Sequence, residues 1–382
     1  MYLHPERTVN RLPTTILLKP VMSQASLESK PGYWLFSRTM DLSVFLGSAI
    51  LALGLLMLGS ITGDLHSDTP EWMWVPAILM IDVAHVWSTS FRVYFDKSEF
   101  RRRFWLYSLV PVFGWFLGVA LYSEGRDLFW TALAYLAVFH FVRQQYGWVA
   151  LYRTKRQEKK RFSRWFDTVT IYTATVYPLI WWHANLPRKF HWFKADDFLD
   201  FLPKDILAVL FPLYCLVMGT YVVKSIYCSV KGQANPGKDV IVVTTAVCWY
   251  VGMITFNSDY AFTVTNVIIH GVPYIALIFW YMKTKPTEAD EEKSPGSGLR
   301  LLIVLLATIW MFAFFEELLW DKTQWKDRGW LFGEDWETAS FEWLLVPLLA
   351  VPQWTHYVLD GFIWKRRSNP GLKQRFSNPR NC

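Results

Sequence analysis

Four histidines stand singly in long apolar stretches of the sequence: His85, His140, His270 and His356. Each has a polar neighbour about one helical turn away, and these neighbours are Asp82, Gln144, Asn266 and Asp360, respectively. Residues three or four positions apart share one face of a helix. An imidazole is costly in hydrocarbon and is usually kept there for a function. The pattern therefore predicts a buried polar site assembled from four helices.

The residue types in this pattern favour a metal ion. Neutral imidazole suits iron, copper or zinc, and carboxylates in the same set favour iron or manganese. We expect a transition metal, most simply iron, bound by the four histidines together with Asp82 and Asp360. A carboxylate that does not bind the metal can instead orient a ligating imidazole. Further polar partners are expected at Gln144, Asn266, Gln353, Arg92 and Arg143.

The composition is that of a membrane protein. The chain has 382 residues, of which 53% are hydrophobic, and it contains 22 tryptophans. About 20 helical residues are needed to cross the hydrocarbon core of a bilayer. We count ten apolar stretches of suitable length, at residues 41–62, 72–94, 104–122, 128–152, 167–183, 206–228, 239–256, 260–283, 300–320 and 341–364. The sequence thus predicts an all-α, polytopic integral membrane protein with about ten transmembrane helices.

The positions of Lys and Arg predict the topology. Of the 39 Lys and Arg residues, 29 fall in the segments that are cytoplasmic if the N-terminus is cytoplasmic. Such an excess follows the positive-inside rule and predicts that both termini are cytoplasmic. The net charge of +7 then reports topology and attraction to anionic lipids, and no nucleic-acid partner is expected.

This topology aligns the four histidines. The stretches that carry them all run from the outside to the inside of the membrane. At 1.5 Å per residue, the four imidazoles fall within roughly 8 Å of one another in depth. We therefore expect them to converge on one site.

The chain divides into three parts. Residues 1–40 form a cytoplasmic N-terminal tail without the features of a signal peptide, residues 41–364 form the transmembrane helical domain, and residues 365–382 form a basic cytoplasmic tail. Within the domain, the Pro-, Gly- and charge-rich residues 284–299 predict a flexible cytoplasmic linker. The expected location is the inner membrane of a bacterium.

A layer of intramembrane histidines on several helices resembles the membrane-bound carotenoid-cleaving dioxygenases of the Brp/Blh family, whose iron is held by histidines alone. The resemblance is one of architecture, and it covers no continuous motif. It implies an oxygenase, hydroxylase or desaturase type of oxidoreductase that acts on a lipid or isoprenoid. Membrane lipids, a lipophilic substrate and a redox partner are the expected partners.

Two other functions stay open at this stage. A transporter or proton pathway can use the same His, Asp and Arg network without a cofactor, and a haem protein can use histidines as axial ligands. The remaining candidate residues receive ordinary roles. We expect Glu316 and Glu317 to be solvated at the outer surface, and His4, His66, His183 and His191 to be surface histidines.

Overall fold

A computed structural model describes residues 32–285, 296–369, 372 and 376. The described residues belong to one compact unit and form helices and loops, with no β-strand among them. The predicted tail at residues 1–40 and the predicted linker at 284–299 lie largely outside the described residues, as does most of the tail at 365–382.

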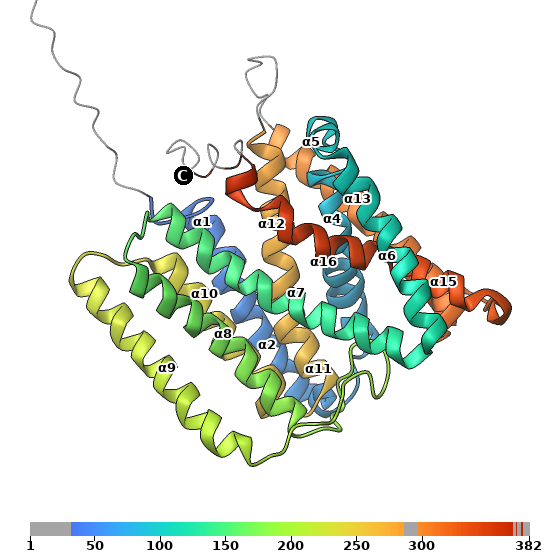
Figure 1. The fold of residues 1–382 in the computed structure, drawn as a ribbon, viewed down its shortest axis with the longest axis horizontal. Helices are drawn as coiled ribbons and strands as arrows, with labels where there is room; N and C mark the ends of the chain where they lie inside the picture. Colours follow the sequence, from blue (N-terminus) through green and yellow to red (C-terminus); the bar gives the residue numbers. More distant parts are fainter. Residues whose placement is uncertain (1–31, 286–295, 370–371, 373–375, 377–382) are drawn as a thin grey trace, which may run out of the picture. The chain divides into compact units, whose positions relative to one another are not determined.

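The longer helices and the joined helical segments follow one another along the chain and pack together (Figure 1). Their bounds are α1–η1–α2 (Arg38–Asp41, Leu42–Leu46 and Gly47–Thr62), α3–η3–α4 (Glu71–Met73, Trp74–Val83 and Ala84–Arg92), α5 (Lys97–Arg102), α6 (Phe104–Glu124), α7 (Arg126–Lys155), α8 (Arg161–His183), α9 (Ile206–Val230), α10–η4 (Pro236–Tyr250 and Val251–Thr255), α11–η5–α12 (Asp259–Phe262, Thr263–Val267 and Ile268–Lys283), α13–η6 (Ser297–Trp320 and Asp321–Trp325), α14 (Gly329–Phe332), α15 (Glu342–Leu349) and α16 (Val351–Ile363). Short 3-10 turns are η2 (Asp64–His66), η7 (Ala339–Phe341) and η8 (Arg366–Ser368).

Each of the ten predicted stretches falls on helical structure, and six of these helices are long and apolar enough to cross a membrane. The six are Arg38–Thr62, Phe104–Glu124, Ile206–Val230, Pro236–Thr255, Asp259–Lys283 and Ser297–Trp325. Three of the other four stretches carry candidate site residues, and the stretch 341–364 is divided between the two short helices α15 and α16. The described part of the chain is therefore helical with several membrane-length helices, whereas the number of ten spans remains a prediction.

Burial separates one central helix from the lipid-facing ones. Most of the span Asp259–Lys283 is buried, whereas very little of the span Ile206–Val230 is. On α9, Val209, Leu216 and Val223 are each at least 66% exposed. Such an apolar surface is unfavourable in water and suits contact with lipid chains. Figure 1 also shows α16 crossing α4 and α12 steeply rather than running parallel to them.

Two π-helical segments and one glycine bring the central helices together. The segment η3 (Trp74–Val83) ends two residues before His85, and η5 (Thr263–Val267) ends three residues before His270. π-helical turns are uncommon and occur frequently at functional sites. Beside His270, a Cβ atom on Gly271 would lie 2.6 Å from Ile81 Cγ2 and 3.2 Å from the Ile81 carbonyl oxygen. Only glycine therefore allows α12 to approach η3 this closely.

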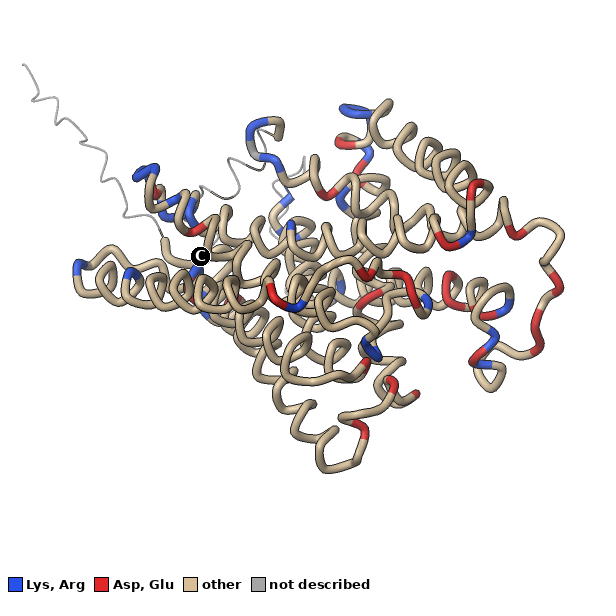
Figure 2. Tube along the Cα trace, turned by 60° about the horizontal axis from the view of Figure 1, so that its bottom comes forward, with Lys and Arg blue, Asp and Glu red and all other residues tan. Residues whose placement is uncertain are grey.

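The loops form two groups that agree with the predicted topology. Among segments predicted to be cytoplasmic, Lys285 pairs with Asp96 and Arg102 donates to Asn369. Among segments predicted to be external, Thr69 donates to Asp259, and Lys189 donates to the carbonyl oxygen of His66. Figure 2 shows much of the Lys and Arg along the upper margin of the trace and much of the Asp and Glu in the loops at right.

A buried ionic network fastens the first of these loop groups. Asp96 accepts a hydrogen bond from Tyr281 at 2.7 Å and lies 2.8 Å from Lys285 Nζ. Burial alone would raise the pKa of Asp96, but Lys285 and its other donors outweigh burial and hold this pKa well below the usual range. The pKa of Glu99 is also lowered, since Arg102 and neighbouring donors outweigh its burial. Both carboxylates are thus favoured in the ionised form.

This network predicts acid sensitivity. Because Asp96 and Glu99 have lower pKa values in the folded than in the unfolded chain, their contribution to stability is complete above about pH 4.5 and is lost as the pH falls below it. The thermal unfolding midpoint of the detergent-solubilised protein should therefore decrease as the pH is lowered from 5 to 3.5. An Asp96→Asn/Glu99→Gln variant should unfold at lower temperature at neutral pH and show a flatter pH dependence, whereas exposed Asp335→Asn should follow the wild type. The prediction would be contradicted if the thermal unfolding midpoint of the double variant depended on pH as steeply as that of the wild type.

The close helix contact predicts a second stability effect. Gly271→Ala should destabilise the protein by about 1–3 kcal/mol, the usual cost of overpacking, because its Cβ meets Ile81. Gly219→Ala is the matched control, since a Cβ at this position on α9 has no neighbour within 4 Å. The control should be neutral or slightly stabilising, because alanine favours a helix. Unfolding in detergent, followed by circular dichroism, measures both variants.

Candidate metal centre

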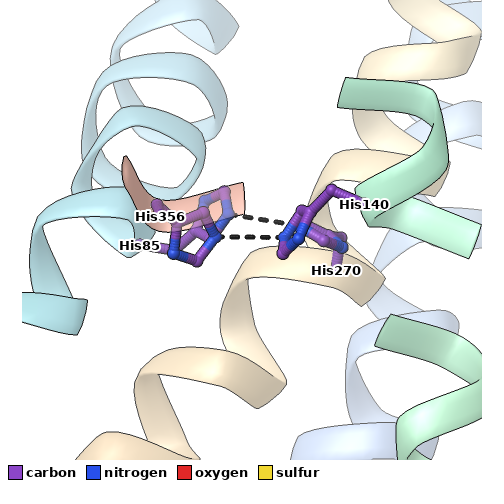
Figure 3. Close-up of side chains that lie close together, drawn as sticks. All are labelled: His85, His140, His270 and His356. Carbon is purple, nitrogen blue, oxygen red and sulfur yellow. Dashed lines mark hydrogen bonds between the residues drawn. The ribbon is translucent and has the colours of Figure 1, made fainter. Parts of the chain in front are cut away.

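The four histidines converge as expected. Each offers one nitrogen atom, and these four atoms all lie within 4.8 Å of one another. The Nε2 atoms of His85 and His270 are 3.1 Å apart, and those of His140 and His356 are 3.0 Å apart. Figure 3 shows His85 and His356 on one side of a small space and His140 and His270 on the other, with both close contacts running between the two sides.

Four helices far apart in the sequence contribute one imidazole each. His85 lies on α4, His140 on α7, His270 on α12 and His356 on α16. All four are at most 3% exposed. The site is therefore a property of the assembled bundle and cannot exist in any single helix.

Aromatic side chains enclose the rings. Phe141 stacks on His270 with ring centroids 3.6 Å apart, and Tyr357 stacks on His140 at 4.9 Å. Tyr274 meets His356 edge to face at 5.0 Å. Packed aromatic rings restrict rotation of the imidazoles, so the directions of their Nε2 atoms are fixed by packing.

The outer Nδ1 atoms face a second layer of polar groups. Thr89 Oγ1 lies 2.7 Å from His356 Nδ1, and the Thr89 hydroxyl lies 3.0 Å from that of Tyr274. Asp82 is 3.6 Å from His85 Nδ1, and Asp360 is 3.9 Å from His140 Nδ1. A ligating histidine usually directs its second nitrogen to such a partner.

These positions change the roles expected for the two carboxylates. We expected Asp82 and Asp360 as ligands, but both lie beside Nδ1 atoms and neither belongs to the group of converging ligand atoms. They are thus placed to orient imidazoles. Asp360 also lies by His140, on another helix, rather than by its sequence neighbour His356, because α16 crosses the bundle steeply.

The predicted amide partners also have other contacts than their sequence positions suggested. Gln144 donates at 2.7 Å to the backbone carbonyl of His270, so it joins α7 to α12 instead of supporting His140. Asn266 donates to Thr265. Gln353 donates to Glu316 Oε1 at 3.4 Å, away from His356.

The two arginines lie outside the cluster. Arg92 is buried in the ionic network at the helix ends, where its Nη1 is 3.3 Å from Glu99 Oε2. Arg143 was expected as a polar partner of the site. It is exposed, donates to the hydroxyl of Tyr172 and lies over the ring of Tyr146 at 4.8 Å.

Some polar residues near the site were missed in the sequence. Glu316 and Glu317 are buried instead of solvated, at 5% and 8% exposure, and Glu316 accepts a hydrogen bond from Trp87 at 2.6 Å. Their adjacent positions near the end of an apolar helix gave no sign of which side they face. Thr89 follows His85 by four residues, and that one-turn spacing was the available signal.

His183 is a further correction. It is 7% exposed rather than a surface residue, and its Nε2 lies 2.9 Å from the hydroxyl of Tyr135. It does not belong to the four-histidine group. His183 is thus a buried histidine with a structural hydrogen bond, which makes it a useful control.

Three cavities reach the histidine cluster from different directions. A cavity of about 350 Å³ between α7, α12 and α16 includes His140 in its wall. A more polar cavity of about 370 Å³ includes His85, Asp82 and Glu317 and extends to loop residues such as Asp68. A smaller one, of about 170 Å³ between α4, α6 and α16, includes His356. The cluster is buried, but these three cavities lead to it.

The close nitrogen atoms of the cluster need either a proton shared in an N–H···N hydrogen bond between neutral rings or a bound cation. A neutral imidazole carries one proton, and its other nitrogen presents a lone pair. Nitrogen atoms 3.0 Å apart repel unless a proton lies between them or a cation binds both. The donor set consists of four imidazole nitrogens from buried rings, which is a fitting set for a transition-metal ion. No protein-family model, curated protein or solved structure matches this chain.

The second layer predicts a measurable effect on metal affinity. Thr89→Val removes the oxygen that faces His356 Nδ1 while keeping the side-chain volume nearly unchanged. Loss of such a partner typically costs 10- to 100-fold in affinity. Metal competition titrations on the purified protein should show this loss, while Thr62→Val, a change at an exposed threonine, should leave the affinity unchanged. Equal affinities for Thr89→Val and wild type would exclude an orienting role.

Proposed function

We propose that the four histidines bind one transition-metal ion, most simply iron, and that the protein is a membrane-embedded non-haem oxidoreductase of the oxygenase, hydroxylase or desaturase type. The single observation that carries the proposal is the convergence of four buried imidazole nitrogens within 4.8 Å. The membrane-length helices support a site within the bilayer.

The spacing of the nitrogen atoms suits one ion. At a metal-nitrogen distance of about 2.1 Å, two nitrogens on the same ion lie at most about 4.2 Å apart, and neighbouring ones about 3.0–3.4 Å apart. The two shortest pairs, at 3.0 and 3.1 Å, fall in the neighbouring range. The widest separation of 4.8 Å needs to close by about 0.6 Å, a small adjustment of ring positions.

The same spacing argues against haem. A haem iron takes histidines only above and below the porphyrin plane. In this cluster, all four nitrogen atoms lie so close together that the macrocycle would overlap the rings that are not axial ligands. The structure therefore supports a haem function less well than a non-haem function.

Each part of the chain has a role under this proposal. When bound, the metal supplies redox chemistry and open coordination positions for oxygen activation. The four imidazoles would hold it. Thr89 would orient His356 through a hydrogen bond to Nδ1, and Asp82 and Asp360 lie 3.6 and 3.9 Å from the Nδ1 atoms of His85 and His140. The rings of Phe141, Tyr274 and Tyr357 exclude bulk water from the centre.

A lipophilic substrate is the substrate class that this setting favours. The cavity beside His140 is lined largely by aromatic and aliphatic side chains, and the surrounding helices suit a bilayer. A lipid or isoprenoid can enter such a site sideways, as the resemblance to Brp/Blh-type enzymes implies. A bacterial inner-membrane location and a separate electron donor belong to this proposal.

One observation favours a second function, a transporter or proton pathway. The cavities at His140 and at His85 approach the cluster from different sides, and the second is rich in carboxylates, including Asp82, Asp259 and Glu317. Intramembrane ionisable groups between two cavities are typical of ion and proton paths. The two functions differ in whether the purified protein holds a metal.

Metal analysis tests the choice. The purified protein should contain close to one transition-metal ion per chain, and His140→Ala and His356→Ala should each lose most of it because one of four ligands is missing. His183→Ala is the control, since it removes a buried histidine outside the cluster. Elemental analysis after removal of loosely bound ions measures all four proteins. A folded, metal-free wild type would favour the transport function, and a Soret band would favour haem.

A further inference from the structure

The cavity beside His140 is an apolar groove between two helices, and it extends well beyond the histidines. It follows α7 from Phe139 to Thr154, a length of about 22 Å at 1.5 Å per residue. Its opposite wall is formed by α16 from Tyr357 onwards and by Trp364 and Lys365, which follow the end of that helix. This shape suits an extended chain better than a compact molecule.

Two glycines give the groove its depth. Gly147 on α7 and Gly361 on α16 both line it, and a Cβ atom at either position would meet nothing within 4 Å. Neither glycine is needed for a tight helix contact or a positive φ. The space beside them is thus open to an occupant, and a larger side chain there would enter the groove without disturbing the core.

The groove faces the lipid phase. Phe139 at its inner end is 60% exposed although it adjoins the buried ligand His140. An exposed phenylalanine on a helix of this bundle is typical of contact with lipid chains. A ligand can therefore pass sideways between the bilayer and the metal centre.

The charges along the groove favour an anionic ligand. Arg143 and Lys365 line it, and neither is among the ion pairs of the described residues. The acidic residue in the wall is Asp360, at the inner end beside His140. An arginine on a lipid-exposed helix face is costly without an anionic partner. A carboxylate or phosphate would supply that partner.

We propose that this groove binds a single-chain lipid with an anionic head group, which contacts Lys365 while its chain lies over Gly361 and Gly147 and reaches His140. The juxtaposition of an apolar groove, two cations without an ion pair among the described residues and the histidine cluster carries this inference. It rests on the proposed function in treating the ligand as a substrate of the metal centre. A fatty acid and a prenyl phosphate share the required chemistry.

Photolabelling tests the proposal directly. The full-length protein in phosphatidylcholine nanodiscs is exposed to a C18 fatty acid with a photoreactive group in its chain, and labelled peptides are identified by mass spectrometry. Labels should concentrate on the groove-lining residues of α7 and α16. Unlabelled oleate or geranylgeranyl phosphate should compete, and oleyl alcohol should compete at least tenfold more weakly because it lacks the charge.

Variants separate the groove from non-specific lipid binding. Gly147→Phe and Gly361→Phe should each lower specific labelling at least tenfold, because the new ring fills the groove. Gly219→Phe is the matched control on lipid-facing α9, where a Cβ also meets nothing within 4 Å. Arg143→Gln combined with Lys365→Gln should remove the preference for oleate over oleyl alcohol.

Three outcomes would overturn the proposal. Equal competition by oleate and oleyl alcohol would exclude recognition of the anionic head. Equal labelling of Gly147→Phe and Gly219→Phe would exclude the groove, and competition by dioleoyl phosphatidylglycerol alone would assign it to a bilayer phospholipid. The metal content of each variant is measured in parallel, so a failure of the metal centre is distinguishable from a failure of the groove.

Discussion

The structure depends on the convergence of four imidazole nitrogens at one point away from water. Four Nε2 lone pairs at distances of 3.0–4.8 Å are unfavourable unless protons or a cation lie between them, because the low dielectric of the interior strengthens every electrostatic term. Whether protons or a cation lie between the nitrogens, the four helices are joined at one point. The cluster is thus both the candidate site and a constraint on how the bundle closes.

The rest of the interior is arranged to keep that point fixed. The Nδ1 atoms of His85, His140 and His356 face Asp82, Asp360 and Thr89, and aromatic rings restrict the imidazoles from the sides. The close approach of α12 to η3 requires Gly271 next to His270. A site with this much support differs from a set of polar residues that merely satisfy one another. It has the features of a site that is organised before its ligand arrives.

The approaches to the cluster differ in chemistry. The groove beside His140 is largely apolar and contains Arg143 and Lys365, whereas the cavity beside His85 contains several carboxylates and extends to loop residues. One centre with an apolar and a polar approach suits chemistry that joins a membrane-dissolved molecule to water-soluble reactants or protons. A pure proton path would not need the long apolar groove. The two approaches therefore connect the metal proposal with the lipid proposal.

The sequence alone determined the elements and the set of histidines. Hydropathy placed ten helical stretches, all of which fall on helices, because long apolar runs in a bilayer leave the backbone few alternatives. Matched residue counts along four stretches predicted that His85, His140, His270 and His356 meet, and they do, although α16 crosses its neighbours steeply, so its residue count does not measure depth. Both inferences use only the positions of residues along the chain, which can be read directly from the sequence.

Only the tertiary structure decided which side chains meet across helices. Same-helix spacing assigned Asp360 to His356 and Gln144 to His140, but Asp360 lies by His140, and Gln144 binds the carbonyl of His270. The burial of Glu316 and His183 was equally invisible in the sequence. These features follow from crossing angles and helix rotation, such as the steep path of α16, and those are fixed by packing of all the helices at once. Spacing within a helix gives the face of a residue but not its partner.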